Sequence, residues 1–236
     1  QPLTARLPDV PNRQRTVQSM AINSNPSLKA RHMLFSATTG GGKTTAVHQL
    51  PQLKKARRIA LYDPYDAYTQ LGKKTVIKTY SLKHFAFALD IAMKQKKAFV
   101  VSLCRTYGVK ELTLFARIVW ALADGNKELH VVIEELIGSI VSPQTLSKPV
   151  AELWNGGRQF GLVMYALFQR PQEVPKTVVR QSQFKWIGKQ DAKADCRYWS
   201  AEIDVPMEDI DRLQDLEYYL KEKGAPPQYG KIALPY

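Results

Sequence analysis

Residues 32–45 read HMLFSATTGGGKTT, in which a short apolar segment runs into three glycines, a lysine and two threonines. The apolar half predicts a buried strand over 32–37, and residues 43–50 predict a helix that Pro51 ends. Three consecutive glycines between a strand and a helix let the backbone turn tightly, so that several N–H groups point at one anion. The stretch therefore predicts a phosphate-binding loop at the end of a strand.

The loop matches the P-loop pattern of nucleotide-binding proteins, with Ala37 in the place of the usual first glycine. Lys43 is expected to contact the β- and γ-phosphates, and the Thr44 hydroxyl to ligate a metal ion. The predicted cofactors are therefore ATP and Mg²⁺. The other predicted cofactor-binding positions are Thr39, Gly40, Gly41, Gly42 and Thr45, of which Thr45 falls inside the helix.

Further apolar runs alternate with helical patterns along the rest of the chain. This alternation predicts βαβ units, and so an α/β P-loop NTPase fold with a mostly parallel sheet and helices on both faces. The strands are expected at 58–62, 74–78, 98–103, 130–133, 162–167 and 184–187, and the main helices at 82–93 and 110–122.

The two ends of the chain differ from its middle in composition. Residues 1–30 are polar, with prolines at 2, 8, 11 and 26, and predict an extended basic arm. A single P-loop domain is then expected over 31–236. Near its end, an acidic polar helix is predicted at about 209–223, because Gly224 and Pro226 would stop it, and an edge strand at 229–234.

Two acids, Glu134 and Glu135, end the apolar run 131–133. In P-loop enzymes an acid pair in this position serves hydrolysis: the first lies near Mg²⁺ and the second polarises the attacking water. Glu134 replaces the usual aspartate, so how the two share these roles stays open. The alternative is a pair of acids stabilised by a helix dipole, and the strand that precedes them favours the catalytic interpretation.

Charge is unevenly distributed along a chain whose net charge is +13. Residues 51–97 carry 11 Lys/Arg against 3 acids, and residues 191–223 carry 10 acids against 5 Lys/Arg. Such a field would attract a polyanion to one part of the surface. No apolar run approaches the roughly 20 residues that a membrane span needs. The two cysteines, Cys104 and Cys196, are expected to be buried thiols.

The segment TTGGGKT at 38–44 resembles the P-loop of the FtsK/HerA superfamily of DNA-pumping ATPases. A later stretch adds to the likeness: GRQFG at 157–161, a strand, and FQRPQ at 168–172 are similar in order and spacing to that family's Gly-Arg, strand and Gln-Arg-Pro. The likeness covers about residues 31–190. It implies a ring, usually hexameric, that moves double-stranded DNA through a central pore.

By the same resemblance, Gln169 would be the sensor that reads the γ-phosphate from the end of its strand. Arg158 would be the finger that reaches a neighbouring subunit's nucleotide, with Arg170 as a nearby competitor. An arginine supplied in this way stabilises charge on the transferring phosphoryl group and couples subunits.

Size and the lack of a membrane span favour one branch of that superfamily. A chain of 236 residues resembles the genome-packaging ATPases of tailless, membrane-containing icosahedral viruses. This resemblance implies capsid-vertex or portal-like partners and a place at the virion vertex or in the host cytoplasm. The alternatives are another DNA pump of the superfamily, for conjugation or DNA processing, a monomeric P-loop kinase or nucleotide switch, and a non-catalytic DNA-binding scaffold.

Overall fold

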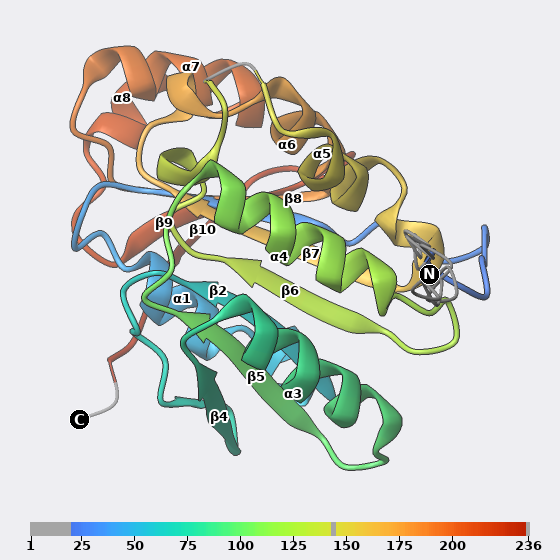
Figure 1. The fold of residues 1–236 in the computed structure, drawn as a ribbon. Coiled ribbons are helices and arrows are strands. Elements are labelled where there is room, and N and C mark those ends of the chain that lie inside the picture. The colour runs from blue at the N-terminus through green and yellow to red at the C-terminus, as the bar shows by residue number, and fades with distance from the viewer. Residues whose placement is uncertain (1–19, 143–144, 235–236) are drawn as a thin grey trace, which may run out of the picture.

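The computed structural model describes residues 20–142 and 145–234 and is built around one large sheet (Figure 1). Its strands are β1 (Met33–Ser36), β2 (Arg58–Asp63), β3 (Gln70–Leu71), β4 (Lys74–Thr79), β5 (Phe99–Cys104), β6 (Leu129–Ile133), β7 (Leu162–Phe168), β8 (Phe184–Gly188), β9 (Glu217–Glu222) and β10 (Gln228–Lys231). They lie in the order β10-β9-β8-β1-β7-β6-β2-β5-β4-β3. From β8 to β4 every neighbouring pair is parallel, and antiparallel strands extend the sheet at both edges.

Helices connect the parallel strands and cover the sheet. They are α1 (Lys43–Gln49), α2 (Pro51–Lys55), α3 (Leu82–Lys94), α4 (Val109–Ala121), α5 (Lys148–Asn155), α6 (Lys176–Gln181), α7 (Lys193–Ile203) and α8 (Met207–Asp211), with 3₁₀ turns η1 (Ile137–Ser139), η2 (Gly157–Phe160) and η3 (Pro171–Glu173). Figure 1 shows α3 and α4 across the near face and α1 behind the sheet. The predicted α/β fold, mostly parallel with helices on both faces, is confirmed.

Successive residues of each central strand point to opposite faces, so the sheet separates two apolar clusters. Leu34 packs with α3 to α8 on one face, while Phe35 packs with α1 and α2 on the other. Strands buried on both faces explain the continuous apolar runs of the sequence. Three tryptophans, Trp154, Trp186 and Trp199, are buried in these clusters.

The arm predicted over 1–30 falls partly outside the described residues, which begin at residue 20. Residues 20–30 form no helix. They lie along the molecule through backbone hydrogen bonds from Ile22 to Ala123 and from Asn25 to Gln159. Both cysteines are free and buried as predicted, and burial raises the pKa of each thiol to about 11.

The prediction of an acidic helix at about 209–223 is wrong. Only α8 is helical there, and β9 follows it after a turn in which Leu216 has a φ of 68°. The stretch EYYLKE at 217–222 pairs antiparallel with β8, and Tyr218 stacks on Trp186 at 5.1 Å between ring centroids. The charge pattern is compatible with a helix or a strand, so the pairing with β8 and the aromatic packing decide that this segment is a strand. The predicted edge strand is present as β10.

Within the described residues, none of the helices has the length and apolar character required to cross a membrane.

Candidate active site

The glycine-rich loop joins the carboxyl end of β1 to the first turn of α1. Gly40 and Gly42 have φ of 78° and 94°, in the left-handed region that favours glycine. A methyl group at Gly41 would lie 2.9 Å from Cβ of Ala37. Ala37 itself is fully buried and does not have positive φ, so its methyl group is tolerated where the usual motif has glycine.

Lys43 reaches back into this loop from the start of α1. Its ammonium donates to the carbonyl oxygens of Ala37 at 2.6 Å and Thr38 at 3.1 Å. Burial lowers the pKa of Lys43, and the nearby carboxylates of Glu135 and Glu134 oppose that shift. A cation held inside a loop of backbone N–H groups is an arrangement suited to a polyphosphate.

Glu134 begins directly after β6 and lies opposite Thr44. The Thr44 hydroxyl donates to Glu134 Oε1 at 3.2 Å, and the Tyr68 hydroxyl donates to the same oxygen. Burial raises the pKa of Glu134, and the nearby buried carboxyl group of Asp63 raises it further. Two hard oxygen donors together, with buried negative charge that no adjacent cation neutralises fully, fit the predicted Mg²⁺ pair Thr44 and Glu134.

Glu135 and Gln169 lie beside the loop at the ends of adjacent strands. The strand β7 lies between β1 and β6, so its end places Gln169 between the P-loop and the acids. Gln169 accepts from the Thr39 hydroxyl at 3.2 Å and donates to Glu135 Oε2 at 3.4 Å. Glu135 is half-buried and has a φ of 51°, an uncommon conformation for this residue type.

The structure therefore brings together most of the predicted site. Lys43, Thr39, Thr44, both glutamates and Gln169 meet at the carboxyl edge of the parallel strands, where α/β sheets bind ligands. Thr45 lies inside α1 and is half-buried.

Arg158 lies apart from this group. It belongs to η2, which precedes β7, and so lies at the amino edge of the sheet, whereas the P-loop follows β1. Its guanidinium donates to the carbonyl oxygens of Pro26 at 2.7 Å and of Leu28. Arg158 is thus too far from the P-loop of its own chain to act there, and only its predicted role toward a neighbouring subunit remains open. Arg170 follows Gln169 and its side chain is 57% exposed.

Two residues at the site have no signal in the sequence. Tyr68 lies in the loop between β2 and β3, is fully buried, and stacks on His48 of α1 at 4.9 Å. Asp191 follows β8 and accepts from the Thr38 hydroxyl. Neither occupies a recognisable motif, because each reaches the P-loop only through the tertiary fold.

A glycine-rich loop between a parallel strand and a helix, with a lysine inside it and carboxylates on a nearby strand, defines the fold of P-loop NTPases. No protein-family model matches the chain. Protein P9 of Pseudoalteromonas phage PM2 is 24% identical over 221 residues, which span 90% of this chain and 95% of that protein.

Among solved structures, the genome packaging NTPase B204 of Sulfolobus turreted icosahedral virus 2, in complex with AMPPCP, is similar in fold. The TM-score is 0.68 at 14% identity, covering 87% of this chain and 98% of that one. The bacterial conjugative coupling protein TrwB gives 0.63 at 11% identity, over 90% of this chain and 87% of that one. The predicted resemblance is borne out in the fold, which the chain shares with these two proteins.

Proposed function

We propose that this chain is an ATPase that uses ATP hydrolysis to move double-stranded DNA, and that it packages a viral genome. The observation that carries the proposal is the meeting of Lys43, Glu134, Glu135 and Gln169 at one edge of the sheet. The solved relatives with this fold include a genome packaging NTPase and a conjugative coupling protein. The phage protein P9, similar over 90% of this chain, favours the viral branch over conjugation.

Each residue of the site has a role that its contacts support. The glycine loop would surround the phosphates with N–H groups, while Lys43 would leave its two carbonyl partners for the β- and γ-phosphate oxygens. Thr44 and Glu134 would hold Mg²⁺, which when bound neutralises charge on the phosphates. Glu134 is preset for this by its bonds to Thr44 and Tyr68.

Glu135 would polarise the attacking water, because its carboxylate is partly exposed beside the loop whereas that of Glu134 is buried. Gln169 contacts both Thr39 and Glu135, so a γ-phosphate that displaced either contact would alter the position of the base. The amide therefore suits a sensor that reports whether ATP is bound.

The basic excess of residues 51–97 supports a polyanionic partner. Its exposed members come from α2 on one face of the sheet, from α3 on the other face, and from the turns before β4 and β5, and they are Lys54, Lys55, Arg57, Lys73, Lys83, Lys94, Lys96 and Lys97. Exposed cations contact phosphates without reading bases. Duplex DNA is therefore the polymer that this ATPase is proposed to move.

The same proposal includes a ring, with six subunits as the expected number, in which Arg158 serves a neighbouring active site. Its partners would be capsid-vertex or portal-like proteins, and its location the virion vertex or the host cytoplasm. Arg158 lies at the sheet edge opposite its own P-loop, which suits a residue that faces another subunit.

The test is ATP hydrolysis with Mg²⁺ in the presence and absence of duplex DNA, with the native mass measured alongside. A DNA pump gives several-fold faster hydrolysis with DNA and a ring mass. A monomer whose hydrolysis ignores DNA would contradict the proposal and favour a kinase or nucleotide switch.

A further inference from the structure

The loop between β5 and α4, residues 105–108, leaves the sheet at the same carboxyl edge as the P-loop. It opens with Arg105, directly after β5, in the left-handed conformation with a φ of 54°. A non-glycine residue keeps such a conformation only where its surroundings hold it there. Its side chain is nevertheless 71% exposed, so the backbone is fixed while the guanidinium stays accessible to solvent.

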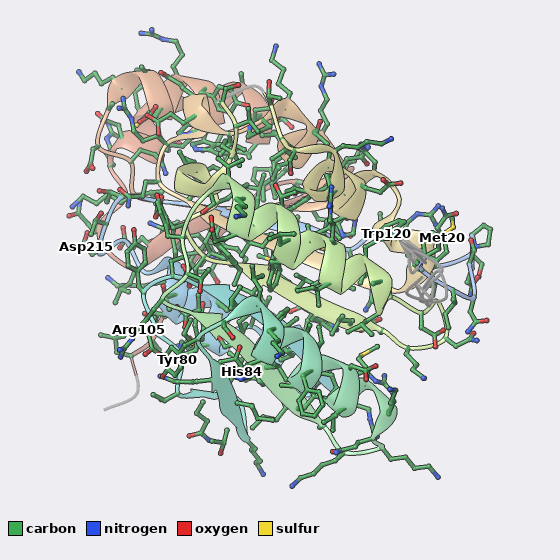
Figure 2. The ribbon with its side chains drawn as sticks, in the orientation of Figure 1. Met20, Tyr80, His84, Arg105, Trp120 and Asp215 are labelled. Carbon is green, nitrogen blue, oxygen red and sulfur yellow. The ribbon has the colours of Figure 1, made fainter. Side chains whose placement is uncertain are left out.

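One exposed aromatic ring lies against that guanidinium, and two more exposed tyrosines lie in the loops that follow β2 and β5. Its Cζ lies 5.3 Å from the centre of the Tyr80 ring, and Figure 2 shows the two residues on the same side of the molecule. Tyr80 and Tyr107 are exposed by 54% and 51%, and Tyr65, in the loop after β2, by 68%. An exposed arginine offers duplex DNA a phosphate contact, and the Tyr80 ring beside it helps to orient the guanidinium.

Arg105 can leave its present partner at little cost. Asp66 accepts from Arg105 at 3.0 Å and from Lys78 at 2.5 Å. If Arg105 turned toward a DNA phosphate, Lys78 would keep Asp66 paired. Asp66 therefore positions Arg105 and still leaves its guanidinium able to bind another anion.

The other end of the loop touches the segment that follows the catalytic acids. The Tyr107 hydroxyl lies against Gly138, where any side chain would overlap it. Next to it, the buried Ser139 hydroxyl accepts from the Gly108 N–H at 3.2 Å and bonds the Tyr62 hydroxyl at 3.0 Å. Gly138 and Ser139 belong to η1, which begins two residues after Glu135.

We propose that the 105–108 loop is the DNA-sensing loop of this ATPase: Arg105 binds a backbone phosphate of duplex DNA, and Tyr107 transmits that contact through Gly138 and Ser139 to Glu135. The inference rests on the proposed function and names where its partner acts. Tyr107 and Gly108 both contact η1, whose first residue follows Glu135 by two positions, so the path between the two sites is short. Tyr107 is in this view a positioning residue for the base.

The first arm of the test measures binding of a random-sequence duplex over a range of salt concentrations. Arg105→Ala is compared with Arg117→Ala, an equal charge change at an exposed position in the middle of α4. Arg105→Ala should weaken binding several-fold and make the slope of log affinity against log salt shallower by about 0.9, as loss of one phosphate contact does. Arg117→Ala should match the wild type.

The second arm measures the stimulation factor, the hydrolysis rate with saturating DNA divided by the rate without it. Tyr107→Ala should bring this factor close to one while changing DNA affinity less than about twofold. Tyr229→Ala, at an exposed tyrosine of β10, is the matched control and should keep the wild-type factor.

The outcomes separate the two proposals. A wild-type protein that neither binds nor responds to DNA overturns the proposed function and this inference with it. A DNA-stimulated wild type whose Arg105→Ala variant binds like Arg117→Ala, or whose Tyr107→Ala variant keeps full stimulation, overturns the sensing loop alone.

Discussion

Tyr68→Phe removes one hydroxyl group from a fully buried side chain, and with it a hydrogen bond to Glu134. Hydrogen bonds to charged groups contribute roughly 1.5–3 kcal/mol, so the ionised form of Glu134 should lose about 2 kcal/mol of stabilisation. That loss favours the protonated form of the carboxyl group. Burial has already raised the pKa of Glu134 above its ordinary value of 4.5, and the variant moves it further in the same direction.

The sign of the stability effect follows from proton binding. A carboxyl group with a raised pKa holds more protons in the folded state than in the unfolded state, so the free energy of unfolding falls as pH rises from about 4.5 through the folded pKa. Tyr68→Phe deepens that fall, and its destabilisation should be larger at pH 8 than at pH 5. The acidic limb of the pH–rate profile of ATP hydrolysis should move to higher pH.

The assays are thermal unfolding without nucleotide or Mg²⁺ across this pH range, and the pH–rate profile. Tyr229→Phe is the control, because it makes the same change at an exposed tyrosine whose hydroxyl group bonds a different carboxylate, that of Glu217. A Tyr68→Phe variant with the same destabilisation at both pH values, and an unmoved acidic limb, would refute the assignment of Tyr68 as the group that sets the ionisation of Glu134.

The other predictions concern the site residues and the surface. Lys43→Ala should abolish ATP hydrolysis in a protein whose circular dichroism and unfolding temperature match the wild type; turnover in the folded variant would reject the P-loop assignment. Glu135→Gln should keep nucleotide binding and slow hydrolysis on the order of a hundredfold or more, and equal activity would move the base to Glu134. Duplex DNA should bind without sequence preference and with an affinity that falls steeply with salt; a flat salt response measured by anisotropy would argue against a DNA channel. Arg158→Ala should bind ATP yet lose most turnover, and mixing it with Lys43→Ala should restore part of that turnover. If turnover does not recover after mass measurement has confirmed subunit exchange, Arg158 does not serve the neighbouring active site and Arg170 becomes the candidate.

Local sequence was enough to predict the parts of the site that one segment carries. The P-loop is contiguous, so Gly40 to Thr44 could be assigned from spacing alone, and the structure shows the expected strand, turn and helix. Glu134 and Glu135 follow an apolar run that could only be a buried strand, and β6 is that strand. The continuous apolar runs predicted a parallel sheet because both of its faces are covered.

The parts that tertiary contacts decide could not be predicted in this way. Tyr68 is one tyrosine among eleven, and only the path of the β2–β3 loop brings its hydroxyl to Glu134. Residues 217–222 carry charges that suit a helix, and their pairing with β8 decides that they form a strand. Arg105 and Tyr107 belong to no motif. Only the turn after β5 exposes the Arg105 side chain and places the Tyr107 hydroxyl against Gly138.

The most direct measurement of ATP-driven movement is displacement of a third strand from a DNA triplex by the wild-type chain with ATP and Mg²⁺. A DNA-translocating ATPase releases the third strand at a rate that depends on ATP, while Lys43→Ala, and the wild type with a non-hydrolysable ATP analogue, release none. Rapid ATP hydrolysis on the same DNA without any release of the third strand would contradict translocation.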